Sequence, residues 1–175
     1  MDVDIPSGGY TGIQAMDLLG RKMLIGGGKD FALFDKLELK KFFKKNGLFS
    51  SNPHKKAMCS MLFKLSLMRL NMKLLTLRIG LKAKKNPDNV GGAAVDYIMY
   101  SGYFVMGYFW AVMAQTAHEK LATNPDNADF YKAKIQTAEF YFARLLPRAV
   151  SHRKTMMSGS DNVMAMKEEN FSFDY

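Results

Sequence analysis

The chain has 175 residues, of which 48% are hydrophobic, and a formal net charge of +9. This length and apolarity fit one folded domain with a sizeable core, and they exclude a disordered or purely solvating protein. The positive charge is compatible with an acidic protein partner, an anionic membrane surface or a nucleic acid, and its sign alone does not choose among them. The single cysteine excludes an internal disulfide and a cysteine-based metal cluster.

The N-terminal part is expected to contain a loop over residues 1–10 and short helices over 11–50. A first helical pattern runs from about Thr11 to Leu24 and stops at three consecutive glycines, Gly26-Gly27-Gly28. A second runs from about Asp30 to Lys45. Glycine favours the left-handed backbone that ends a helix, so the three glycines are interpreted as a connector.

Three long helical patterns follow, and residues 168–175 are expected to be a tail. The long helices are predicted at 53–85, 91–123 and 127–157, and each is preceded by an Asn-Pro pair, which favours a helix start. The pairs are Asn52-Pro53, Asn86-Pro87 and Asn124-Pro125. Pro147 lies inside the last pattern and should distort it. Residues 160–167 are predicted to add a short helix.

Helical spacing predicts which side of each long helix is buried. In the first, the predicted buried residues are Met58, Met61, Leu62, Leu65, Met68, Met72, Leu75 and Ile79, and the opposite side carries Lys64, Asn71, Arg78 and Lys85 at seven-residue steps. In the last, they are Tyr131, Ile135, Ala138, Phe142 and Leu145. Cys59 has apolar neighbours, which predicts a buried, inert thiol.

The segment from Tyr97 to Ala117 contains no charged residue and is long enough to span a bilayer. Its tyrosines and glycines are spread along the whole segment, whereas tyrosines of a membrane helix gather at the two interfaces. We therefore predict a helix buried inside a bundle. Since no long stretch alternates apolar and polar residues, the predicted fold is all-α: one helical domain over 1–175, an antiparallel bundle of long helices.

Two stretches resemble a known family. Thr11 to Met23, read as TGIQAMDLLGRKM, resembles the segment after the catalytic loop of acyl-CoA dehydrogenases. Gly102 to Glu169 resembles the extra C-terminal helical domain of the longer members, with a weaker middle at Phe31 to Asn89. The matching motifs in this second stretch are Trp110-Ala111, Phe130-Tyr131-Lys132-Ala133-Lys134, Phe140 to Pro147 and Asn162-Val163-Met164-Ala165-Met166.

The resemblance implies a C-terminal bundle of an enzyme that also has N-terminal helices, a β-domain and FAD. This chain is expected to lack those other domains, and the resemblance places Gly8 at the position of the family's catalytic glutamate. Proton abstraction needs a base, and glycine has none. The nearest acids are Asp4 and Asp17. The chain is therefore expected to be no enzyme by itself and to bind no cofactor.

Other chemistry has little support in the sequence. Gly26-Gly27-Gly28-Lys29 lacks the spacing of a phosphate loop. His54, His118 and His152 fall on different helices without the spacing of a metal site, so no metal is expected. The lysine-rich end of the second helix and the aromatic residues of the fourth are the candidate partner-binding residues: Lys40, Lys41, Lys44, Lys45, Tyr100, Tyr103 and Trp110.

Three hypotheses about function remain open. The first is a non-catalytic structural or interaction protein, an accessory subunit of a larger assembly; in this case the expected location is the mitochondrial matrix of a eukaryote or the cytoplasm of a bacterium. Its expected partners are other protein subunits, with membrane contact only at the periphery. The second is the helical half of a split FAD-dependent acyl-CoA dehydrogenase. The third is a basic module that binds nucleic acid or ribosomes.

Overall fold

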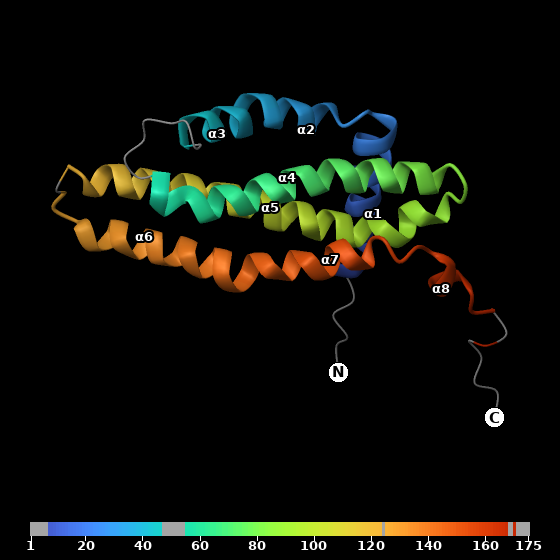
Figure 1. The fold of residues 1–175 in the computed structure, drawn as a ribbon. Helices are drawn as coiled ribbons and strands as arrows, with labels where there is room; N and C mark the ends of the chain where they lie inside the picture. Colours follow the sequence, from blue (N-terminus) through green and yellow to red (C-terminus); the bar gives the residue numbers. More distant parts are fainter. Residues whose placement is uncertain (1–6, 47–54, 124, 168–169, 171–175) are drawn as a thin grey trace.

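The computed structural model describes residues 7–46, 55–123, 125–167 and 170. These residues form helices, turns and short connections and no β-strand, so the predicted all-α bundle is confirmed. Three long helical segments lie side by side in Figure 1, and a shorter helical arm lies along one side of them. The long segments are α4 (Lys55–Ala83), α5 (Asp88–Leu121) and a third that begins with α6 (Ala128–Phe140).

The shorter arm comprises the first helices of the chain. Its part that lies along the bundle contains α2 (Lys29–Phe34), a π-helical segment (Asp35–Leu39) and α3 (Lys40–Asn46), whereas α1 (Ser7–Met16) and the π-helical segment after it (Asp17–Ile25) contact α5, and α1 runs across the bundle in Figure 1. Helix α1 begins inside the stretch expected to be a loop. The predicted stop is confirmed, because Gly27 and Gly28 have φ values of 67° and 64°, which glycine adopts at no steric cost.

Helix α5 is the centre of the bundle. It contacts α1, α4, α6 and α7, and Tyr97, Tyr100 and Phe104 are among its fully buried side chains. The prediction that the uncharged segment packs inside the bundle is therefore confirmed. Within the described part of the chain, no helix has the length and apolarity to cross a membrane.

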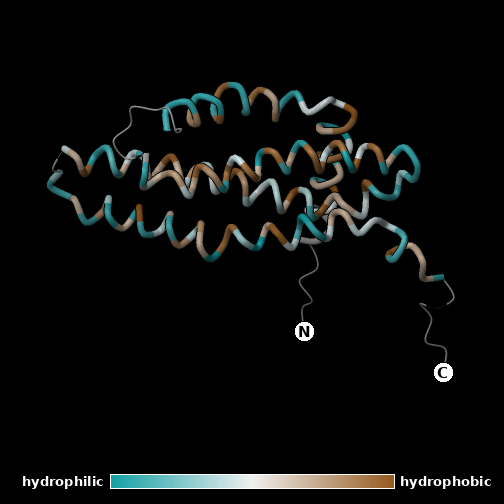
Figure 2. The backbone as a smooth tube through the Cα atoms, in the orientation of Figure 1, coloured by the Kyte–Doolittle hydropathy of each residue, from teal (hydrophilic) through white to brown (hydrophobic). Residues whose placement is uncertain are grey.

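The side of α4 that faces α5 is the one that the spacing predicts. All eight predicted residues, from Met58 to Ile79, are buried. Cys59, in contrast, is exposed, so the prediction of a buried thiol is wrong. Its neighbour Met58 points into the core, and one residue along a helix turns the side chain by about 100°, which carries Cys59 to the outer side. Figure 2 shows hydrophobic residues recurring along α4 and α5.

The helix after Ala128 changes its winding near Pro147. A π-helical segment (Tyr141–Leu145) and a 3₁₀ turn (Leu146–Arg148) separate α6 from α7 (Ala149–Thr155), and a short α8 (Asp161–Met164) follows. Proline has no N–H, so a carbonyl one turn earlier loses its helical donor. The Nζ of Lys64 on α4 donates to the Phe142 carbonyl at 3.1 Å. The expected distortion at Pro147 is confirmed, and it gives α4 a polar anchor on the neighbouring helix.

The predicted helix starts are also informative. The Asn86-Pro87 pair precedes α5, and the Asp88 N–H donates to Oδ1 of Asn86 at 3.0 Å. This side chain satisfies a donor that the first turn of a helix leaves unpaired. Asn52-Pro53 and Asn124 lie outside the described residues.

Candidate protein interface

The aromatic candidates from the sequence belong mainly to the interior. Tyr100 is only 2% exposed, and its hydroxyl donates to the Met68 carbonyl at 3.4 Å. Tyr103 and Trp110 are half-buried: the ring of Tyr103 stacks on His152, and that of Trp110 lies 6.4 Å from Tyr141. The structure therefore places these side chains in and beside the core, and their predicted role in partner binding stays a prediction.

The four lysine candidates lie on α3. Lys40, Lys41, Lys44 and Lys45 are all exposed, and the Lys45 ammonium lies 3.0 Å from a carboxylate oxygen of Glu119 on α5. Interaction of these lysines with a partner also remains a prediction. The lysines and the aromatic candidates come from different parts of the bundle and do not form one site.

The sequence positions compared with the family's catalytic glutamate carry no free carboxylate in the described part of the chain, and elsewhere Nδ1 of His152 lies 2.7 Å from a carboxylate oxygen of Asp96. Gly8 lies in α1, Asp4 lies outside the described residues, and Asp17 forms an ion pair with Arg21 one turn away. That pair lowers the pKa of the Asp17 carboxyl, mainly through the hydrogen bond from Arg21, and a weaker base results. No group of three or more potential ligands for a metal occurs among the described residues.

Helix α4 has a second apolar side, which faces away from the core. Phe63 and five leucines form this outer stripe, and each is between 43% and 69% exposed: Phe63, Leu67, Leu70, Leu74, Leu77 and Leu81. The intervals alternate between four and three residues, the spacing of a coiled-coil seam. At 100° per residue, all six positions fall within about 40° of one line along the helix. Helix α4 is therefore apolar on two opposite sides, of which the described part of the chain covers one.

The residues predicted to form a polar outer side lie at one edge of the outer stripe. Lys64, Asn71 and Arg78 are on the edge of α4 that faces the last helical segment. The prediction of a polar outer side was therefore incomplete, because the leucines of the outer stripe occupy its middle. This arrangement of a narrow apolar line between polar edges is typical of a helix that packs against another helix.

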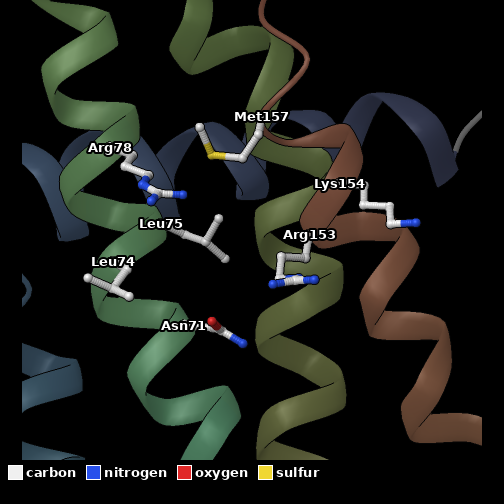
Figure 3. A pocket seen from close by; sticks show the side chains of 7 residues that line it. All are labelled: Asn71, Leu74, Leu75, Arg78, Arg153, Lys154 and Met157. Atoms are coloured by element: carbon white, nitrogen blue, oxygen red, sulfur yellow. The ribbon is translucent and has the colours of Figure 1, made fainter.

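A hollow of about 310 Å³ lies between α4 and α7, beside the outer stripe. Figure 3 shows Arg78 of α4 and Arg153 of α7 extending toward each other across it, whereas Lys154 points away. Asn71 lies at one end of the hollow and Met157 at the other, with Leu75 between the two helices. None of the ion pairs among the described residues involves Arg78 or Arg153. The hollow therefore presents unneutralised positive charge over an apolar floor.

A second hollow of about 320 Å³ continues the first along α4. It is lined by side chains of α4 and of the segment around Pro147, and it shares Asn71 and Arg153 with the first hollow. Lys64 and Lys82 hold the two helices in place, because their Nζ atoms donate to the Phe142 and Met157 carbonyls at 3.1 and 2.8 Å. The groove between α4 and the last helical segment is thus built by polar contacts at both ends.

The other edge of the outer stripe also borders a hollow, of about 520 Å³, between α4 and the arm. Its wall contains Asp35, 5% exposed, which accepts hydrogen bonds from both Nε and Nη2 of Arg69 and lies 3.5 Å from Nζ of Lys73. The Arg69 hydrogen bond lowers the pKa of the Asp35 carboxyl, against the opposing effect of burial. Lys36 and Lys40 line the same hollow. Both edges of the outer stripe are therefore basic.

A comparison with protein families gives a match over most of the chain. The family described as acetyl-CoA dehydrogenase C-terminal like matches residues 38–167. The chain belongs to this family. The match begins in the arm and runs through α3 to α8, so it includes the outer stripe and the α4 residues at both of its edges. The resemblance inferred over Gly102 to Glu169 is confirmed for the part inside the match, whereas Thr11 to Met23 lies outside it. No curated protein matches the sequence significantly.

The family membership concerns the fold of the chain, whereas the outer stripe concerns its surface. Membership gives the fold of this acetyl-CoA dehydrogenase C-terminal-like domain, and the outer stripe shows where its surface is unlike that of an ordinary solvated helix. Sequence reasoning missed the outer stripe, although the alternating spacing of four and three is visible between Phe63 and Leu81. Two apolar lines on one helix compete for the core, and only the packing of α5 decides which is covered.

Proposed function

We propose that this acetyl-CoA dehydrogenase C-terminal-like domain is a non-catalytic interaction protein, an accessory subunit that uses the outer stripe of α4 to join a larger assembly. The single observation that supports this most is the outer stripe itself, six large apolar side chains in a line on an outward-facing helix. A contiguous exposed apolar surface with a polar rim is characteristic of a protein interface. The expected location in the mitochondrial matrix or the bacterial cytoplasm is part of the same proposal.

The absence of catalysis is also part of the proposal. Two of the described carboxylates, Asp17 and Asp35, are held in ion pairs with Arg21 and Arg69, which makes both of them weaker bases. General base catalysis needs a carboxylate held against a bound substrate, and Gly8 at the position implied by the resemblance offers none. We therefore expect no turnover of acyl-CoA by the isolated chain.

A second candidate is the helical half of a split FAD-dependent acyl-CoA dehydrogenase, and the family match is the observation that favours it. In that case a separate chain would supply the flavin site. The two candidates differ in what the native assembly contains. The yellow absorption of flavin and acyl-CoA oxidation in the purified assembly would support the split enzyme.

The test uses the tagged full chain in its native cell. We expect it to migrate in an assembly far larger than its own 19.8 kDa, and Leu70→Lys/Leu74→Lys to release it as a free chain. The control is Phe140→Lys on α6, because Phe140 is 55% exposed, as Leu70 is, but lies away from the outer stripe. A native chain that migrates alone, or a double variant that stays in the assembly, contradicts the proposal.

A further inference from the structure

The charge on the two helices that border the groove has one sign. Helix α4 carries seven lysine or arginine residues and no aspartate or glutamate over its 29 residues. Helix α7 carries His152, Arg153 and Lys154 in its last turn and likewise has no acid. Neither helix can neutralise its own charge through the usual pairs one turn apart. Asp35 pairs with Arg69 and Lys73 and Asp96 pairs with His152, so solvent ions or another molecule have to balance the charge that remains.

The side chains of Arg78 and Arg153 both line the first hollow. They extend toward each other from α4 and α7 across the hollow, with the Asn71 amide beside them (Figure 3). Two facing cations repel each other, and the repulsion is relieved when a carboxylate lies between them. A guanidinium presents planar N–H donors that match a carboxylate, so the pair fits an acidic side chain.

The length and spacing of the outer stripe match a second helix. From Phe63 to Leu81 it covers 18 residue steps, about 27 Å at 1.5 Å per residue. An apolar line of this spacing accepts the side chains of another helix between its own. The grooves on both sides of α4 leave room for the flanking residues of such a helix.

The same charges disfavour two other occupants of the surface. A second copy of this chain would bring an equally basic pair of edges against Arg78 and Lys73, and like charges across an interface weaken it. A flat anionic bilayer could cover the leucines, but Arg78 and Arg153 line a hollow between two helices, and a protruding acidic side chain fits a hollow better than a flat surface does. A helix with acidic edges satisfies the leucines and the arginines together.

We propose that the partner of the outer stripe is a separate amphipathic helix that carries aspartate or glutamate along both edges of its apolar side, with one carboxylate between Arg78 and Arg153. This inference rests on the proposed function and names the chemistry of the partner. The leucines supply the apolar contact, and the basic edges select an acidic helix against a basic one.

The test uses three synthetic helical peptides of about three heptads with leucine at the seam and glutamate, glutamine or lysine at the edges. Binding to the full chain is measured by fluorescence anisotropy. We expect the glutamate peptide to bind at least tenfold more tightly than the lysine peptide, and this preference to shrink with added salt. In Arg78→Glu/Arg153→Glu the preference should reverse. The control is Lys120→Glu/Lys132→Glu, the same charge change on exposed positions of α5 and α6, which should preserve the preference.

The outcomes separate the partner's chemistry from the interface itself. If the three peptides bind equally well and Leu70→Lys/Leu74→Lys abolishes all binding, the acidic partner is wrong while the interface remains. If no peptide binds a chain whose circular dichroism is helical, the helix-docking inference is overturned, and the native assembly test still decides the proposed function. Two other results contradict an acidic helix as the partner. One is a dimer of the isolated chain that Leu74→Lys dissociates, and the other is tight binding of the chain to phosphatidylserine vesicles.

Discussion

The two apolar sides of α4 predict very different costs for the same substitution at Leu65 and Leu70. Leu65 is 0% exposed and lies against α5, where a Cβ built on Gly107 would meet its Cδ2 at 3.2 Å. Leu65→Ala removes buried methyl groups and leaves a closed cavity, so we expect a loss of about 3 kcal/mol in the free energy of unfolding. Leu70 is 55% exposed. Leu70→Ala opens no closed cavity, and we expect a loss of about 0.5–1 kcal/mol.

The measurement is urea unfolding followed by far-ultraviolet circular dichroism at a concentration where the chain is monomeric. With an m value of about 2 kcal/mol/M, Leu65→Ala should lower the midpoint by about 1.5 M and Leu70→Ala by less than about 0.5 M. Both substitutions are Leu→Ala inside one helix, so the change in helix propensity cancels in the comparison. Equal midpoint shifts would refute the reasoning, because they would mean that the outer stripe is covered in the folded monomer.

Three further outcomes are expected. Asp35→Asn should lower the free energy of unfolding by about 2 kcal/mol near neutral pH, because charge-assisted hydrogen bonds to a partly buried arginine are lost. The folded-state pKa of Asp35 is lowered, so in urea unfolding the difference in stability between this variant and the unchanged chain should disappear as the pH falls below the usual value of 3.8. Burial raises the pKa of Tyr97, Tyr108 and Tyr141 to about 12, so tyrosinate absorbance should show that they ionise later than exposed tyrosines, and stability should fall as the pH rises from 10 toward 12. Gly102→Ala should raise the thermal midpoint through about 0.5–1 kcal/mol of helix propensity, since a Cβ there meets no atom within 4 Å.

Each of these has a result that contradicts it. If Asp35→Asn remains less stable than the unchanged chain in strong acid, the ionised carboxylate of Asp35 is not the cause of the difference in stability. If all eight tyrosines ionise together near pH 10 in the folded protein, the burial of the three phenols is wrong. A lower thermal midpoint for Gly102→Ala would mean that this position of α5 is in contact with another surface.

Local pattern predicted the elements and the core side of α4, because helical spacing and burial are linked within one segment. The eight predicted core positions from Met58 to Ile79 needed only the period of a helix. The candidate interface was harder, since it depends on contacts between distant segments. Lys64 reaches Phe142 and Asp96 pairs with His152, and nothing in the sequence near either residue indicates its partner. The Asp96 carboxylate lies 2.7 Å from Nδ1 of His152, which is 56 residues further along the chain.

The two buried polar pairs of the arm determine where it can rest on the bundle. The Asp35 carboxylate accepts a hydrogen bond from Nη2 of Arg69 on α4, and Nδ2 of Asn46 donates to Oε1 of Gln115 on α5 at 2.7 Å. Phenylalanine and leucine side chains would tolerate a slide of the arm by one helical turn, about 5.4 Å, with little loss of apolar contact. Such a slide would separate both polar pairs and leave their side chains buried without partners. An unpaired buried charge costs far more free energy than a shifted apolar contact. The arm therefore has one register on the bundle, and the width of the groove beside Leu77 is set with it.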